Sequence, residues 1–245
     1  MQINEKITLI IYKEMNIIVT GGSRGIGKQI ALYLARDKNN NVLITGRDHI
    51  SLFKIYDSSE FKNIKYLVYD LSRLYQTVEI FKNEVRSVFD TVDILINNAG
   101  SFYSKSFAET SEMEAREMME VNFFAPALII RTLLDLMKKG AHVVNISSMG
   151  GFQGSVKFPG LSYYCASKAA LACISECLAI ELKELEISVN CLALGSVQTE
   201  MLGDSFPGYK APVDAYEMGK FIGDFALNGN RYFNGKVIPV ASTTP

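Results

Sequence analysis

Short apolar runs alternate with longer segments of helical periodicity along most of the chain. The runs are rich in Val, Ile and Leu and mostly lack polar alternation, which is typical of parallel strands covered on both faces. Strands are predicted at 17–20, 42–45, 65–69, 94–97, 142–147, 188–193 and 236–240. Helices are predicted at 25–37, 74–89, 111–139, 164–186 and 213–227, with Pro126 kinking the third. This alternation predicts an α/β fold, a Rossmann-type doubly wound, mostly parallel seven-stranded sheet with helices on both faces.

A length of 245 residues suits a single domain of this kind. We expect residues 15–245 to form it, because Met15 opens the first apolar strand. Residues 1–14 are interpreted as an N-terminal extension, either a flexible one or the product of an upstream start codon. The segment 195–213 contains several glycines and prolines and is predicted to be a mobile loop or lid.

Composition narrows the classes of partner. The chain has 25 basic and 26 acidic residues and no basic tract, which argues against nucleic acid. No apolar run is long enough to span a bilayer, and the N-terminus lacks a signal-peptide pattern, so no membrane partner is expected. The four cysteines lack the spacing of a secreted framework, which favours a cytoplasmic location. Cys173 and Cys177 are predicted to be buried structural thiols, and no metal site is expected because neither histidine has matching spacing.

The motif TGGSRGIG at 20–27 follows the first predicted strand and opens the first predicted helix. Its glycines permit a tight turn and close approach of the backbone to a ligand, and the helix start offers N–H groups to a pyrophosphate. By itself such a motif is also compatible with a glycine-rich turn that binds nothing. The predicted cofactor-binding residues of this loop are Gly21, Ser23, Arg24, Gly25, Ile26 and Gly27.

The end of the second predicted strand indicates which dinucleotide is bound. An NAD site usually carries an acidic residue there, whereas this chain has Arg47. A guanidinium suits a 2′-phosphate better than a free hydroxyl, and Arg24 could supply a second one. We therefore predict that NADP(H) is preferred over NAD(H). The alternative is that Arg47 is a solvated surface residue, and the neighbouring Asp48 weakens the case.

Tyr164 and Lys168 are four residues apart and would share one face of a helix. A neighbouring ammonium and a positively charged nicotinamide would both favour phenolate, so the pKa of the tyrosine is expected to fall and make it a usable acid or base. Alone, such a pair is commonplace on helix surfaces. However, Asn97, Ser148 and Asn122 are also predicted at or beside the carboxyl ends of parallel strands, where ligands bind in open α/β sheets.

With these pieces in order, the chain closely resembles the short-chain dehydrogenase/reductase family from about Met15 to the C-terminus. The matching pieces are TGGSRGIG at 20–27, Asp70-Leu71, NNAG at 97–100, Asn122, ISS at 146–148, YCASK at 164–168 and Val197-Gln198-Thr199. Several motifs in the right order and at nearly the right spacing are far more specific than any one of them.

The resemblance implies four catalytic residues. Tyr164 would be the general acid in reduction, and Ser148 would hold the substrate carbonyl oxygen. Lys168 would bind the nicotinamide ribose and lower the pKa of the tyrosine, and Asn122 would hold a water in a proton relay. Further cofactor contacts are implied for Asp70, Leu71, Asn97, Ala99, Gly100, Val197 and Thr199, in addition to Tyr164 and Lys168.

The implied function is an NADP(H)-dependent oxidoreductase that reduces a small carbonyl compound, or runs the reverse reaction, as a homodimer or homotetramer. A 3-oxoacyl-reductase-like activity is one possibility, and a small ketone, a sugar or a pterin-like substrate are others. A catalytically idle cofactor-binding regulator or scaffold on the same fold is the alternative class. The chain departs from the family pattern at Leu194, in a longer gap between Ser148 and Tyr164, and at its C-terminal end, so specificity is expected in these loops.

Overall fold

The fold is that of a computed structural model, which describes residues 14–241. Residues 1–13, almost all of the predicted N-terminal extension, and residues 242–245 lie outside the described residues. Seven parallel strands form one sheet in the order β3-β2-β1-β4-β5-β6-β9. Their bounds are β1 (Met15–Thr20), β2 (Asn40–Gly46), β3 (Ile64–Val68), β4 (Val92–Asn97), β5 (Met137–Ser148), β6 (Ser188–Leu194) and β9 (Val237–Val240). The predicted Rossmann-type fold is confirmed.

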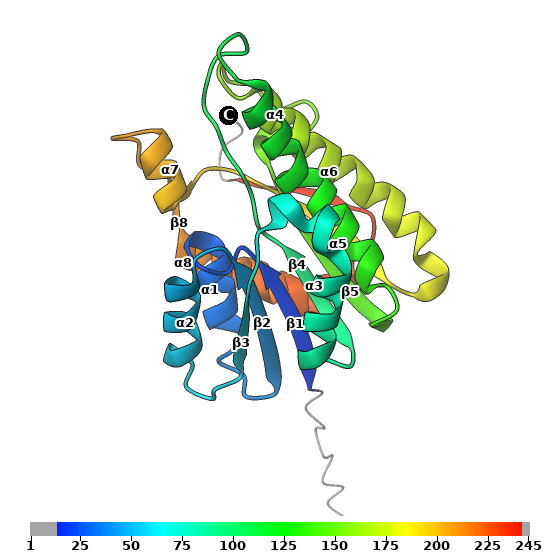
Figure 1. The fold of residues 1–245 in the computed structure, drawn as a ribbon. Coiled ribbons are helices and arrows are strands. Elements are labelled where there is room, and N and C mark those ends of the chain that lie inside the picture. The colour runs from blue at the N-terminus through cyan, green and yellow to red at the C-terminus, as the bar shows by residue number, and fades with distance from the viewer. Residues whose placement is uncertain (1–13, 242–245) are drawn as a thin grey trace, which may run out of the picture.

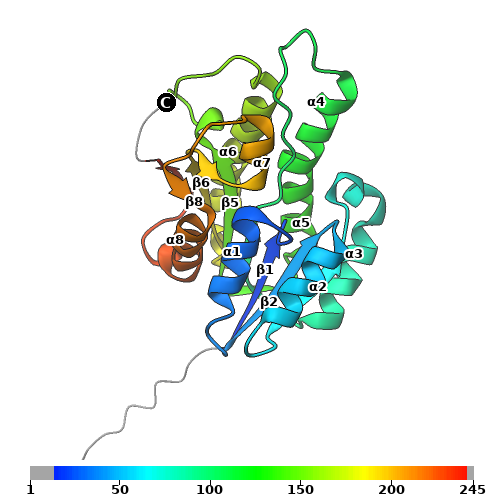
Figure 2. The ribbon, with the colours of Figure 1, turned by 90° about the vertical axis from the view of Figure 1, so that its left-hand side faces the viewer.

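Helices cover both faces of the sheet (Figures 1 and 2). One face carries α1 (Gly25–Leu34), α2 (His49–Ser58) and α8 (Ala215–Asn228), and the other carries α3 (Leu74–Val88), α5 (Ala125–Leu133) and α6 (Ser162–Glu181). The central strand β1 supplies both cores, since Ile17 and Val19 pack on the first face and Ile18 on the second. Each fully buried aliphatic side chain of this size contributes about 1.5–3 kcal/mol.

The order in which successive strands are added to the sheet changes direction at β1, although all strands remain parallel. Strands β2 and β3 lie on one side of β1, whereas β4, β5, β6 and β9 lie on the other. The crevice between the carboxyl ends of β1 and β4 is therefore the place where a doubly wound sheet binds its ligand. The glycine-rich loop after β1 and the residues after β4 meet at this crevice.

The predicted helix over 111–139 is wrong in its length and in the place of its irregularity. Helix α4 (Glu112–Met119) is followed by a π-helical turn, η2 (Glu120–Phe124), and then by α5, which ends at Leu133. Pro126 stands in the first turn of α5, and its nitrogen cannot donate the α-helical hydrogen bond to the carbonyl of Asn122. The distortion therefore falls before the proline. Strand β5 begins at Met137, earlier than the polar sequence 138–140 suggested.

The segment 195–213 is not a plain loop. It contains β7 (Val197–Gln198) and α7 (Glu200–Ser205) and ends at β8 (Val213–Asp214), which pairs with β7. The remaining short helices are η1 (Leu71–Arg73), η3 (Met149–Gly151), η4 (Lys183–Leu185) and η5 (Gly229–Arg231). Within residues 14–241, no helix is long and apolar enough to cross a membrane.

The prediction that Cys173 and Cys177 are buried is wrong, because both side chains are exposed on α6. Both cysteines lie on the same side of the helix, and the residues that α6 buries, such as Leu171 and Ser175, lie on another. The cysteine spacing indicated a shared face but not which way that face points.

His142 on β5 is a buried polar link between layers. Its Nδ1 lies 2.9 Å from the carbonyl oxygen of Ala226, and its Nε2 lies 3.0 Å from the amide nitrogen of Asn190. Because an amide N–H only donates, the neutral ring accepts at Nε2 and donates from Nδ1. Burial lowers the pKa of His142 from 6.5 to about 4.

The depressed pKa of His142 predicts acid sensitivity. Between pH 6.5 and pH 4 the unfolded chain binds a proton that the folded protein does not, so stability is complete above this window and is lost as the pH falls through it. We expect the free energy of unfolding to drop by about 3 kcal/mol more in wild type than in His142→Gln between pH 7 and pH 4. Urea denaturation followed by circular dichroism measures this difference. Equal pH slopes for the two proteins would contradict it.

Candidate active site

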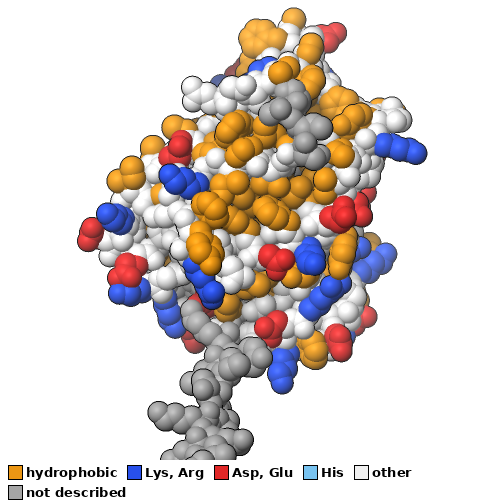
Figure 3. Space-filling view, turned by 180° about the vertical axis from the view of Figure 1, so that it is seen from behind, with side chains coloured by type: hydrophobic (Ala, Val, Ile, Leu, Met, Phe, Trp, Pro, Cys, Tyr) orange, Lys and Arg blue, Asp and Glu red, His pale blue; other side chains and the backbone are white. Residues whose placement is uncertain are grey.

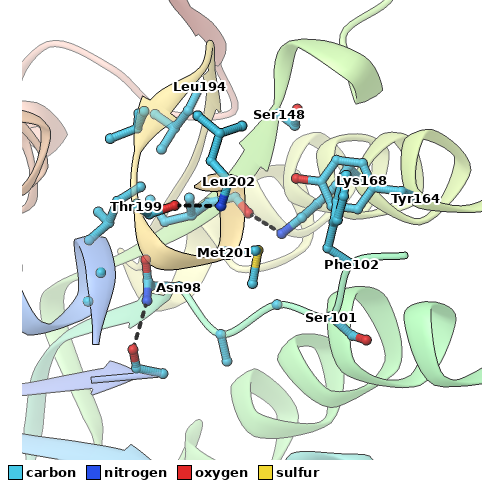
Figure 4. A pocket seen from close by; sticks show the side chains of 18 of the residues that line it. Asn98, Ser101, Phe102, Ser148, Tyr164, Lys168, Leu194, Thr199, Met201 and Leu202 are labelled. Atoms are coloured by element: carbon cyan, nitrogen blue, oxygen red, sulfur yellow. Dashed lines mark hydrogen bonds between the residues drawn. The ribbon is translucent and has the colours of Figure 1, made fainter. Parts of the chain in front are cut away.

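A cavity of about 750 Å³ opens at the carboxyl ends of the sheet strands (Figure 4). Most residues predicted from the sequence line it, although they come from distant parts of the chain. These are Gly21, Ser23, Arg24, Gly25, Ile26, Gly27, Arg47, Asp70, Leu71, Ala99, Gly100, Ser148, Tyr164, Lys168, Val197 and Thr199. Asn97 and Asn122 are the two predicted site residues that do not line it.

The glycine-rich loop lies against the segment that follows β4. Gly25 has a φ of +53°, a conformation that side chains other than glycine rarely adopt. A Cβ on Gly27 would lie 2.2 Å from the carbonyl oxygen of Gly21, so only glycine fits there. The amide of Asn98 donates to the carbonyls of Thr20 at 3.0 Å and Gly21 at 3.2 Å, which fixes the loop to β4.

The two asparagines of the NNAG motif lie in different places, one inside the sheet and one at the cavity. Asn97 is buried, and its amide donates to Asn145 at 2.8 Å inside the sheet. Asn98, which the sequence analysis did not single out, lines the cavity instead. Alternation of side chains along a strand could have indicated this, because neighbouring residues face opposite ways. Ala99 is tied to the same place, since its N–H donates to the hydroxyl of Thr20 at 3.0 Å.

The part of the cavity beside the glycine-rich loop and the end of β2 carries two exposed guanidinium groups, Arg24 and Arg47. Neither forms a hydrogen bond or an ion pair with another described residue. The carboxylate of Asp48 is engaged elsewhere, because it caps α2 by accepting from the N–H groups of Ile50 and Ser51. Asp70 lines the cavity and caps η1 through the N–H of Ser72.

Tyr164 lies in the first turn of α6 with Ser148 close to its phenol. Burial raises the pKa of Tyr164 to about 12, and the nearby Ser148 hydroxyl offsets part of that rise. The lowered pKa expected from the sequence is therefore not found in the protein on its own. The reason is that Lys168 does not pair with the phenol: its ammonium donates to the carbonyl of Ile146 at 2.8 Å.

Lys168 is 4% exposed, and burial lowers its pKa to about 8. Its Nζ and the Oδ1 of Asn122 both face Gly100, where a Cβ would be 3.6 Å and 3.4 Å from them. The Asn122 side chain forms two hydrogen bonds with the backbone of Ser101. Its Oδ1 accepts from the Ser101 N–H at 2.8 Å, and its Nδ2 donates to the Ser101 carbonyl at 2.9 Å. Asn122 thus lies directly behind the cavity wall rather than in it.

Sequence reasoning missed the apolar part of the site. Phe102 packs edge-on against the Tyr164 ring, with centroids 4.7 Å apart, and against Phe206 at 6.0 Å. Met201 and Leu202 of α7 reach the cavity opposite Phe102 and Tyr164 (Figure 4). The only signal was position: Phe102 follows NNAG, and the other residues belong to the segment interpreted as a lid.

The arrangement is a Rossmann-type dinucleotide cradle joined to a tyrosine, serine and lysine at the end of the same crevice. This combination defines the class of protein, and the comparison with known families agrees. The family model described as short chain dehydrogenase matches residues 15–210. The chain belongs to this family, whose members are NAD(P)-dependent oxidoreductases.

Individual relatives are distant. The dehydrogenase/reductase SDR family member 7B of Xenopus laevis is 30% identical over 197 residues, which are 76% of this chain and 59% of that protein. The chain thus spans about three-fifths of the length of that relative. The 3-oxoacyl-(acyl-carrier-protein) reductase of Aquifex aeolicus is 32% identical over 188 residues, 75% of this chain and 74% of that one. A short chain dehydrogenase from Burkholderia cenocepacia, solved in complex with NADP, superposes with a TM-score of 0.84 at 26% identity, covering 95% and 98% of the two chains.

Proposed function

We propose that this protein reduces a small carbonyl compound to an alcohol at the expense of NADPH, or runs the reverse reaction. The observation that carries the proposal is the convergence of Ser148, Tyr164 and Lys168 on one cavity with the glycine loop. A partly buried phenol with a pKa of about 12 is protonated at neutral pH, as a proton donor to a carbonyl oxygen must be.

Each residue has a distinct role in this proposal. The Ser148 hydroxyl and the Tyr164 phenol would both donate hydrogen bonds to the carbonyl oxygen, and Tyr164 would release its proton as the alkoxide forms. Lys168 would bind the nicotinamide ribose, and its charge would help Tyr164 give up that proton. The Asn122 carbonyl, which Pro126 cannot bond, would hold a water that returns a proton from solvent.

The residues present fit a dinucleotide. Glycine at position 27 lets the start of α1 pack directly against the Gly21 carbonyl, which a Cβ would approach to 2.2 Å. The backbone N–H groups at this helix start could then face a pyrophosphate. Asp70, Leu71, Ala99 and Gly100 would line the adenine and ribose positions, and Val197 and Thr199 would orient the carboxamide. When bound, the nicotinamide supplies the hydride.

Preference for NADP(H) is part of the proposal. Arg24 and Arg47 are exposed in the cavity without an internal anion, and the nearby Asp48 caps α2 instead of facing them. Two such cations would attract a 2′-phosphate and would gain nothing from a free hydroxyl. A member of the family from Burkholderia cenocepacia was solved with NADP, which supports the same choice.

We expect Arg47→Ala to lower the ratio of kcat/KM for NADPH over NADH by about 10- to 100-fold, since a hydrogen bond to a charged phosphate is lost. Arg231→Ala is the matched control, because Arg231 is exposed and lies outside the cavity lining. Initial rates with each cofactor measure the ratio. An unchanged ratio in Arg47→Ala would remove this residue from the 2′-phosphate site.

The function as a whole is tested by an NADPH-oxidation screen against ketones, aldehydes, 3-oxoacyl thioesters and sugars. The Aquifex aeolicus relative makes the thioesters a necessary part of the panel. Turnover of at least one compound supports the proposal. NADPH binding without turnover of any compound would favour the idle regulator instead.

Assembly and location belong to the proposal as well. We expect a cytoplasmic homo-oligomer, dimer or tetramer, built through α4, α5 and α6. Met113 on α4, Phe124 at the end of η2 directly before α5, and Ile180 on α6 are 76%, 51% and 78% exposed. Figure 3 shows a further band of hydrophobic side chains on the face seen from behind. Apolar surface of this kind favours association with another protein surface. Sedimentation would measure the oligomeric state.

A further inference from the structure

Phe102 lies edge-on against the Tyr164 ring, between two residues that are both tied to α4. The two residues beside it are both bonded to Glu117 of α4: the Ser101 hydroxyl donates to one carboxylate oxygen at 3.1 Å, and the Tyr103 hydroxyl donates to the other at 2.8 Å. The Ser101 backbone is also pinned by Asn122. The Phe102 ring, between these anchors, stands at 74° to the Tyr164 ring. This wall is therefore built before any substrate arrives.

The rim of the cavity beside Phe102 is aromatic too, but it is open to solvent. Phe206, directly after α7, meets Phe102 at an interplanar angle of 63°. Phe206, Phe158 and Tyr209 line the cavity and are 36%, 52% and 49% exposed. Covering this apolar rim would gain hydrophobic free energy, and each ring offers an edge or a face to a flat partner.

The charges of the cavity lie away from this aromatic part or are already engaged. Its charged lining residues are Arg24, Arg47, Asp70, Glu117, Lys168 and Glu200. Arg24 belongs to the glycine loop, Glu200 lies over Gly25 of that loop, and Arg47 and Asp70 follow β2 and β3. The positive charge of Arg47 acts on the pKa of Tyr103 and not on that of Tyr164. Glu117 is taken by Ser101 and Tyr103, and the Lys168 ammonium is bonded to the Ile146 carbonyl. Within the described lining, no cation is placed to hold an anionic substrate group beside Tyr164.

We propose, resting on the carbonyl reductase function above, that the substrate is an uncharged ketone or aldehyde whose carbonyl is attached directly to an aromatic ring. The carbonyl oxygen must reach Ser148 and Tyr164, so the groups on the carbonyl carbon come within reach of Phe102. An aromatic ring there gains edge-to-face contacts with Phe102 and Phe206 that a saturated ring does not. A carboxylate there would lose its hydration without finding a partner.

Three carbonyl compounds of similar size test this proposal with NADPH: acetophenone, cyclohexyl methyl ketone and phenylglyoxylate. The second removes only the aromaticity, and the third replaces the methyl group with a carboxylate. We expect kcat/KM for acetophenone to exceed that for cyclohexyl methyl ketone by about tenfold and that for phenylglyoxylate by about a hundredfold. The alcohol products should compete with the ketones for binding in the same order.

Substitutions of single aromatic residues test whether Phe102 and Phe206 cause the preference for acetophenone. Phe102→Leu and Phe206→Leu should each lower the acetophenone to cyclohexyl methyl ketone ratio several-fold. Phe206→Leu, at an exposed helix end, keeps the test valid if the Phe102 variant does not fold. Phe107→Leu should leave the ratio unchanged, since Phe107 is exposed, stacks on Tyr163 and lies outside the cavity lining.

The aromatic preference and the reductase function fail under different outcomes. Reduction of cyclohexyl methyl ketone or phenylglyoxylate as fast as acetophenone would overturn the aromatic preference and leave the reductase function standing. Failure to reduce any carbonyl in the wider screen, with NADPH bound, would overturn the proposed function itself. A ratio that falls equally in Phe107→Leu would mean that the two rings do not form the substrate wall.

Discussion

Tyr164→Phe is expected to lower the rate of carbonyl reduction by about a hundred- to ten-thousand-fold, because it removes the proposed proton donor. The substitution keeps the ring, and with it the edge-on contact to Phe102 at 4.7 Å. The melting temperature should therefore change by no more than about 2 °C, and the affinity for NADPH should stay within a few-fold. Steady-state kinetics, thermal denaturation and fluorescence titration measure the three quantities.

The neighbouring tyrosine provides the matched control. Tyr163 is on the same turn of α6, but its ring stacks on Phe107 and lies outside the cavity lining. Tyr163→Phe makes the same chemical change, loss of a phenol hydroxyl, at the preceding residue, and it should leave the rate within about twofold. Similar losses in both variants would point to a disturbed helix rather than a lost acid.

Lys168→Met is expected to abolish at least 99% of the activity, about a hundredfold loss, while leaving the fold as stable as before or more stable. The lysine is 4% exposed, and burial lowers its pKa to about 8, so the protein bears a cost to keep this ammonium. Methionine fills a similar volume without a charge. Thermal denaturation beside initial rates tests the opposite changes in stability and activity.

The pH dependence of wild type gives a second test of Lys168. Its ammonium is present below its pKa of about 8 and is lost as the pH rises through that value. If its charge supports Tyr164, kcat/KM for reduction should fall above about pH 8. Above this pH, wild type should lose activity without losing its fold.

The matched control for Lys168→Met is Lys183→Met, because Lys183 is exposed beyond the end of α6. Equal losses of activity in Lys168→Met and Lys183→Met would contradict a specific role for Lys168.

Much of the fold could be predicted because its signals are local. Continuous apolar strands such as 17–20 and 188–193 correspond to β1 and β6 within a few residues. The start of β5 was missed because Lys138, Lys139 and Gly140 lie on a partly exposed strand end that pairs at only one point with β4. The π-helical turn was missed because periodicity does not distinguish a break before Pro126 from a kink at it.

The candidate site was predictable only in its polar part. Motifs mark Ser148, Tyr164 and Lys168 because the proposed chemistry requires those residue types. The aromatic wall carries no such mark, since Phe102 and Phe206 are 104 residues apart and meet only when α7 folds against the loop after β4. The pKa of Tyr164 was predicted in the wrong direction for the protein alone, because burial and the direction of the Lys168 ammonium are tertiary properties.

The proposed reaction transfers a hydride from NADPH to the carbonyl carbon and a proton from Tyr164 to the carbonyl oxygen. It is tested by incubating the protein with acetophenone and NADPH deuterated at C4 of the nicotinamide, and analysing the alcohol by mass spectrometry and NMR. We expect one deuterium on the carbinol carbon when the C4 face used by the enzyme is deuterated, and at least about a hundredfold less alcohol in the same time with Tyr164→Phe. An alcohol formed without deuterium from either face, or equally fast with Tyr164→Phe, would contradict it.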